Sequence, residues 1–142
     1  MTARPDIDRP RPWAFWPLRL VATLQTLAMA NQPVFAGQLL AGTFSGLTRH
    51  RENAMLVFFV LVLELVTAVV LRVPGGGPVW PVFFCLGMLA LVAIQMMLGF
   101  TRTLALHVPL GVTLVVATVL MLVWAWRRRP GDWWPGWTGG PA

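Results

Sequence analysis

Four long runs of apolar residues, separated by short joints, constrain this chain more than any other feature of its sequence. An α-helix crosses a hydrocarbon layer of about 30 Å with about 20 consecutive apolar residues. Hydrophobic residues make up 57% of the chain and charged residues only 11%, so lipid is the expected solvent. The four runs cover residues 20–42, 54–73, 79–100 and 104–126.

These runs predict an all-α fold, a four-helix transmembrane bundle whose helices run up, down, up and down. The predicted joints are a charged cluster at 49–53, a Pro-Gly turn at 74–78 and a Thr-Arg-Thr segment at 101–103, all of which contain helix-interrupting or polar residues. The flanking tails contain too few aliphatic residues to form a core, and their tryptophans suit a membrane interface or a partner protein. The predicted domains are a Pro/Arg-rich tail at 1–17, a four-helix transmembrane domain at 18–127 and a Trp/Pro/Gly-rich tail at 128–142.

The arginines predict the orientation of the chain in the membrane. Eight of them lie before the first run, at the end of the second run or after the fourth run, whereas three lie in the joints at the other side. Positively charged segments stay in the cytoplasm, so both termini are predicted to be cytoplasmic, in the inner membrane of a bacterium. Because the basic residues act as topology anchors, we expect no nucleic-acid partner despite a pI near 11.8.

An internal repeat relates the two halves of the chain. Two segments 57 residues apart share the pattern Gln-x-x-x-Gly, followed by seven residues and a histidine. Each copy spans the end of one run, a joint and the start of the next run, so each half is predicted to be a helical hairpin. Both hairpins enter the membrane in the same direction, unlike the inverted repeats of many transporters. The repeated residues are Gln38, Gly42 and His50 in the first copy, and Gln95, Gly99 and His107 in the second.

The chain has only two histidines, His50 and His107, and they occupy equivalent positions in this repeat. Two neutral imidazoles on facing helices are a common way to hold a heme iron from both sides. The alternative is that each histidine caps a helix or lies at the membrane interface, and the sequence leaves both interpretations open.

Several polar residues accompany the histidines in the predicted heme site. Arginines suit the two heme propionates, although each one taken alone also fits ordinary loop charge. The two glutamines of the repeat lie deeper in the first and third helices, where a buried amide needs a partner. The residues in question are Arg49, Arg51 and Arg102, together with Gln38 and Gln95.

Glu64 lies well inside the second run, where an ionisable side chain is costly and usually has a reason. One interpretation is a neutral carboxyl hydrogen-bonded to Gln25. The other is a contact for a proton or a quinone, and the sequence does not decide between them.

The repeated Gln and His pattern resembles one four-helix half of heme A synthase, and also small uncharacterised four-helix membrane proteins with the same pattern. The resemblance covers roughly residues 30–125 and implies that His50 and His107 are axial ligands of a heme near the outer membrane face. Heme A synthase also has a glutamate three residues before a ligand histidine, often with a cysteine pair in that loop. Here Leu47 and Leu104 stand in the place of that glutamate, and the chain's single cysteine is Cys85, so the oxidative chemistry is not implied.

The sequence therefore predicts a membrane-embedded b-type heme protein that serves electron transfer or a redox complex, without a catalytic residue of its own. A bis-histidine iron is coordinatively saturated, which suits electron transfer better than oxygen activation. Two alternatives remain: a heme-free accessory subunit of a larger membrane complex, and a small protein that holds heme only transiently. The expected partners are the lipid bilayer, the subunits of a membrane redox complex and a second copy of the chain.

Overall fold

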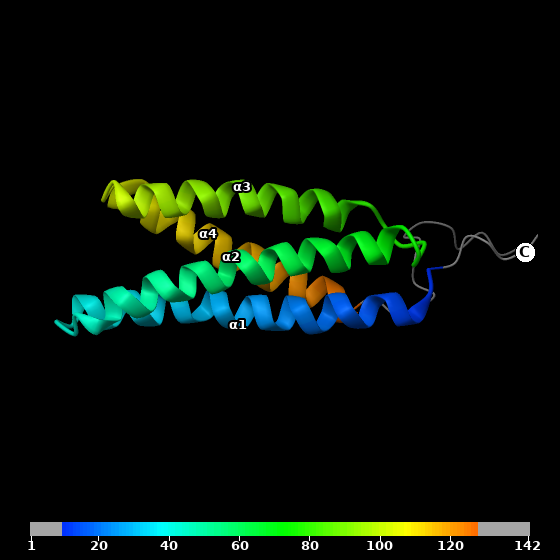
Figure 1. Cartoon of the computed structure of the whole chain (residues 1–142), viewed down its shortest axis with the longest axis horizontal. Coiled ribbons are helices and arrows are strands. Elements are labelled where there is room, and N and C mark those ends of the chain that lie inside the picture. The colour runs from blue at the N-terminus through cyan, green and yellow to red at the C-terminus, as the bar shows by residue number, and fades with distance from the viewer. Residues whose placement is uncertain (1–9, 128–142) are drawn as a thin grey trace, which may run out of the picture.

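The computed structural model describes residues 10–127, which form four long α-helices in one elongated bundle (Figure 1). A 3-10 turn, η1 (Pro12–Ala14), precedes the first helix, and no strand occurs in the described residues. The predicted all-α four-helix fold is confirmed, whereas most of the two predicted tails lies outside the described residues. The helices are α1 (Phe15–Leu40), α2 (Ser45–Arg72), α3 (Trp80–Phe100) and α4 (Leu104–Arg127).

Three of the described helices, α2, α3 and α4, are long and apolar enough to cross a membrane, which defines a membrane protein. α1 is also long enough, with 26 residues, but polar residues such as Gln25, Asn31 and Gln32 make it less apolar. It continues through Pro33 to Leu40. The fourth crossing, by α1, stays a prediction, as does the orientation of the bundle.

The start of α2 differs from the prediction. The helix begins at Ser45 rather than at residue 54, so the charged cluster at 49–53 is helical and the prediction of a joint there is wrong. Arginine and glutamate are good helix formers, and this segment contains no proline. The true joint is short and includes Gly42, whose φ of 86° is left-handed, a conformation that glycine adopts without steric cost.

The α3–α4 joint has the same backbone hydrogen-bond pattern as the α1–α2 joint, but its left-handed residue is an arginine rather than a glycine. Thr43 N–H donates to Gln38 O (2.9 Å) in the first joint, and Thr103 N–H donates to Leu98 O (2.9 Å) in the second. The left-handed residue of the second joint is Arg102, with φ 55°, at a cost of about 1–2 kcal/mol for a residue with a Cβ. When the two joints are aligned on these hydrogen bonds, the number of residues that separates them differs from the 57 residues that separate the two copies of the sequence repeat.

The four helices pack as two hairpins side by side. α1 and α3 run in the same direction (Figure 1), as predicted for a parallel pair of hairpins. α1 contacts α2 and α4, and α3 also contacts α2 and α4. Within the described residues α2 and α4 make no close backbone contact, so they lie on one diagonal of the bundle.

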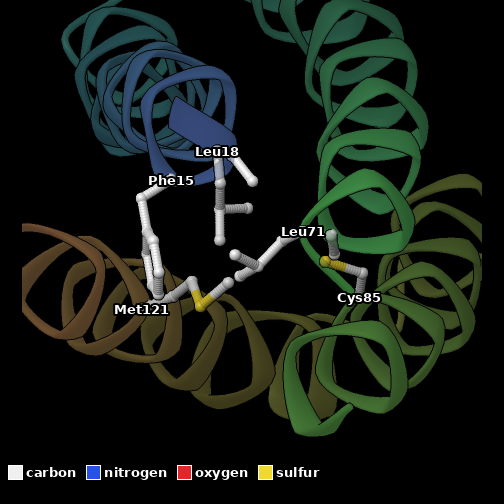
Figure 2. Close-up of a cluster of buried hydrophobic side chains, with 7 residues drawn as sticks. Phe15, Leu18, Leu71, Cys85 and Met121 are labelled. Carbon is white, nitrogen blue, oxygen red and sulfur yellow. The ribbon is translucent and has the colours of Figure 1, made fainter. Parts of the chain in front are cut away.

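Buried apolar side chains form two clusters along the bundle axis. The first lies near the start of α1, and Figure 2 shows its side chains converging from all four helices, with Cys85 packed beside Leu71. The second lies farther along, toward the α1–α2 and α3–α4 joints. We call them the first and second apolar clusters; the first contains Ala14, Phe15, Leu18, Ala68, Leu71, Cys85 and Met121, and the second contains Ala28, Met29, Val57, Leu61, Met88, Val92 and Leu114.

Beyond the second apolar cluster the two hairpins separate. Figure 1 shows the α1–α2 joint (cyan) and the α3–α4 joint (yellow) lying apart at one end of the molecule. Among the described residues between that cluster and the joints, the buried ones are Gly46 and Asn53, and Asn53 Nδ2 donates to Ala28 O (2.8 Å). The apolar core therefore ends before the helices do, and the predicted site lies beyond it.

Candidate histidine-pair site

The structure brings the two histidines of the chain together. His50 lies near the start of α2 and His107 lies in the first turn of α4. Their ring centroids are 6.2 Å apart and their planes are inclined by 59°. Because α2 and α4 are diagonal helices, the two rings meet across the bundle.

Each imidazole is held by a backbone carbonyl of the preceding helix. His50 Nδ1 lies 3.1 Å from Gln32 O, and His107 Nδ1 lies 2.9 Å from Gln95 O. A carbonyl oxygen only accepts hydrogen bonds, so in these contacts Nδ1 carries the proton and Nε2 keeps its lone pair. Histidines that bind metals are oriented in this way.

The surroundings of His107 are shaped by two glycines. A Cβ placed on Gly99 would lie 3.1 Å from His107 Cε1, and one placed on Gly111 would lie 2.9 Å from Gln95 Nε2. That amide nitrogen donates to His107 O (2.8 Å). Gln95 is therefore bonded to His107 through both its backbone and its side chain, while its Oε1 is buried without a partner among the described residues.

The surroundings of His50 are different. The sequence repeat pairs His50 with Gln38, but Gln38 lies in the last turn of α1, where its Oε1 accepts from Arg49 Nη1 (3.4 Å). Gln32 takes the position beside His50. With its amide turned so that both polar atoms are satisfied, Gln32 donates to His50 Nδ1 (2.7 Å) and accepts from the Ala54 N–H (2.9 Å). His50 thus has two hydrogen-bonded arrangements, and only the one with the carbonyl leaves Nε2 unprotonated.

Gln32 is the site residue that the sequence repeat missed. Residues of an antiparallel hairpin lie at the same level when they are equally far from the joint. With the joint placed at residues 49–53 this rule gives no partner for His50, whereas the joint before Ser45 places His50 opposite Phe35, and Gln32 lies about one helical turn deeper in α1. Recognising that the charged cluster is helical would therefore have placed the partner of His50 within about one turn of Gln32, but would not have singled out that residue.

The three predicted arginines lie at the same end as the histidines and are exposed. Arg49 and Arg51 flank His50 on α2, and Arg102 is the left-handed residue of the α3–α4 joint. Arg49 bonds Gln38, as described above. Their proposed pairing with propionates stays a prediction.

The protein groups available to a metal here are two imidazoles. Within residues 10–127 no three His, Cys, Asp or Glu side chains gather as they do in an all-protein metal site. Two imidazoles bound in line to one metal through bonds of about 2.0–2.1 Å have ring centroids about 6.3 Å apart, and the observed separation is 6.2 Å. A metal held between these two rings would have to bring its other ligands with it, as a heme does.

Glu64 belongs to another level of the bundle. It is 2% exposed and lies between the two apolar clusters, far along α2 from His50. Both polar atoms of the Gln25 side chain lack a hydrogen-bond partner in the described part of the chain. The predicted hydrogen bond between Gln25 and Glu64 is therefore not formed.

The fold and these contacts define a class of protein: a four-helix membrane protein with a histidine pair across its diagonal. Comparisons with protein-family models, with curated proteins and with solved structures found no match to this chain. The resemblance to heme A synthase stays a prediction, and the argument for function depends on the geometry.

Proposed function

We propose that this chain is a membrane-embedded b-type heme protein that transfers electrons or serves a membrane redox complex. The observation that carries the proposal is the pair of histidine rings 6.2 Å apart across the diagonal of the bundle. A heme held there would supply one-electron redox chemistry.

The residues around the pair have distinct tasks in this proposal. With Nδ1 of His50 donating to Gln32 O and Nδ1 of His107 donating to Gln95 O, each Nε2 would be free to bind iron. Gly99 allows the His107 ring to lie close to α3. The separation of the hairpins beyond the second apolar cluster supports a flat group at this level, and the exposed arginines suit its propionates.

The arginine distribution supports an orientation with both termini in the cytoplasm. The histidine pair then lies near the extracytoplasmic face of a bacterial inner membrane. A redox partner on that side of the membrane would have the shortest path to the heme.

The test is a reduced-minus-oxidised visible spectrum of the full chain purified in detergent from heme-replete cells. We expect a low-spin b-type spectrum that disappears in both His50→Ala and His107→Ala. The matched control is Glu52→Gln, an exposed change two residues from His50, which should keep the spectrum. A colourless wild-type protein would refute the proposal and favour the heme-free accessory subunit.

A further inference from the structure

A second group of polar side chains lies between the two apolar clusters, away from the histidines. Gln25 of α1 is 1% exposed, Glu64 of α2 is 2% exposed and Thr118 of α4 is 4% exposed. The heme proposal assigns no task to any of them. Polar groups are buried at a cost unless they are hydrogen-bonded, so their positions need a reason.

These three side chains share one level of the bundle. Each lies on its helix between a residue of the first apolar cluster and a residue of the second, and the two clusters each join all four helices. The Thr26 hydroxyl also donates across this level to Thr118 O (3.4 Å). The flanking pairs are Leu18 and Ala28 for Gln25, Ala68 and Leu61 for Glu64, and Met121 and Leu114 for Thr118.

The hydroxyl groups near this level already have partners. Thr118 donates to Val115 O (2.8 Å), and Thr67 donates to the backbone oxygen of Glu64 (2.8 Å). The Gln25 amide differs from them, because neither its oxygen nor its nitrogen has a partner in the described residues. A glutamine side chain offers two donors and an acceptor, and here all of them face the interior.

Among residues 10–127, no cation accompanies the Glu64 carboxyl in this layer. On α1 the charged residue is Arg19, which belongs to the end of the first apolar cluster, where its Nε donates to Ala125 O (3.0 Å). On α2 Arg72 donates to Gly77 O (3.2 Å) at the same end. The titratable group of α3 near this level is the buried Cys85 thiol, and α4 contributes Thr118. An ionised carboxylate would thus be buried without a counter-charge, which is strongly unfavourable.

Any group that links Gln25 to Glu64 must be small. Gln25 and Glu64 are almost completely covered, and apolar clusters close the bundle on both sides of them. A ring-sized ligand such as a quinone has no exposed edge by which to enter. Water is the smallest such group, and buried waters commonly make about three hydrogen bonds to polar groups that lack other partners.

We propose that Gln25 and Glu64 form an internal proton-binding site, in which an enclosed water links the Gln25 amide to a Glu64 carboxyl that takes up and releases one proton. The exchange converts the carboxylate and a proton into the neutral acid, and no other reactant is needed. The water bridges groups that are not in direct hydrogen-bond contact. The site is independent of the histidine pair and would be present in heme-free protein.

Infrared spectroscopy of the full chain in lipid bilayers tests this proposal. Glu52 and Glu64 are the only glutamates of the chain. Protein made with ¹³C-labelled glutamate in a Glu52→Gln background therefore carries its label at Glu64 alone. At neutral pH we expect the labelled C=O band of a protonated carboxyl, and we expect it to shift down in D₂O because the proton exchanges. Glu64→Gln in the presence of Glu52 should lose the band.

The Gln25→Leu variant tests the link between the two residues. Loss of the amide should move the labelled band to higher wavenumber, since the carboxyl loses part of its hydrogen bonding. Circular dichroism confirms that the variant is folded. A labelled carboxylate band alone at neutral pH, a band that does not respond to D₂O, or a band unchanged by Gln25→Leu would each overturn the proposal. Heme content does not enter any of these readouts.

Discussion

Gly46 lies where α2 passes close to the backbone of α1, and an alanine there should separate the two helices. A Cβ on Gly46 would lie 2.8 Å from Leu39 N and 2.8 Å from Phe35 O. Both are backbone atoms, which cannot rotate away as a side chain does. Non-bonded heavy atoms are most stable about 3.5–4.0 Å apart, so α2 would have to move away from α1 by about 0.7–1.2 Å.

The expected net effect of Gly46→Ala is a loss of stability. Overpacking of this kind costs about 1–3 kcal/mol, whereas alanine in place of a helical glycine gains about 1 kcal/mol. Because backbone atoms resist the shift, we take the upper part of the cost range. The free energy of unfolding should therefore fall by about 1–2 kcal/mol, a factor of about 5–30 in the ratio of folded to unfolded protein.

Gly87→Ala is the matched control, because a Cβ on Gly87, in the middle of α3, would meet no described atom within 4 Å. This change should leave the free energy of unfolding unchanged or raise it by up to about 1 kcal/mol. The measurement is reversible unfolding of each variant in mixed detergent micelles, followed by circular dichroism. If Gly46→Ala proved as stable as Gly87→Ala, the close approach of α1 and α2 described here would be wrong.

Three further substitutions can be measured by the same unfolding assay. Arg19→Met removes a hydrogen bond to an α4 carbonyl and the stacking of the guanidinium on three aromatic rings, and should cost about 1–3 kcal/mol; a loss below that range would show that the contacts are marginal. Gln95→Ala removes the 2.8 Å hydrogen bond to His107 O and should cost about 1 kcal/mol, whereas Gln38→Ala, at an exposed pair, should stay within about 0.5 kcal/mol of the wild type. Cys85→Ser places a hydroxyl in the first apolar cluster and should cost about 1–3 kcal/mol, and a neutral result would mean that the cluster admits water.

The sequence predicted the four helices well because long apolar runs have few other solutions in a bilayer. It also predicted that the two histidines could face each other, because they occupy equivalent positions in the repeat at the same end of the second and fourth helices. The joint before α2 was placed wrongly because charge was taken as a sign of a loop. A helix that leaves the hydrocarbon layer keeps its hydrogen bonds while its side chains become polar, so composition marks the edge of the membrane rather than the end of the helix.

The sequence repeat was less informative at its glutamines and glycines than at its histidines. Gly42 is the left-handed residue of a joint, whereas Gly99 lies inside α3 against the His107 ring. Gln38 bonds an exposed arginine, whereas Gln95 bonds His107. Residues at matching positions of the sequence repeat do not occupy matching positions in the fold, because α1 ends a few residues earlier in its copy of the repeat than α3 does in the other.

The separation of the hairpins at the histidine end leads to a final prediction about stability. A heme bonded to both histidines would join α2 to α4 at the level where the described apolar core has already ended. Such a ligand binds the folded bundle and not the unfolded chain, and at about 1,000 times its dissociation constant it would add about 4 kcal/mol to the free energy of unfolding. The stabilisation should appear on titrating heme into heme-free protein, and it should vanish in His107→Ala. An equal gain in that variant would mean that heme stabilises the bundle by dissolving between its apolar faces, without the histidine pair.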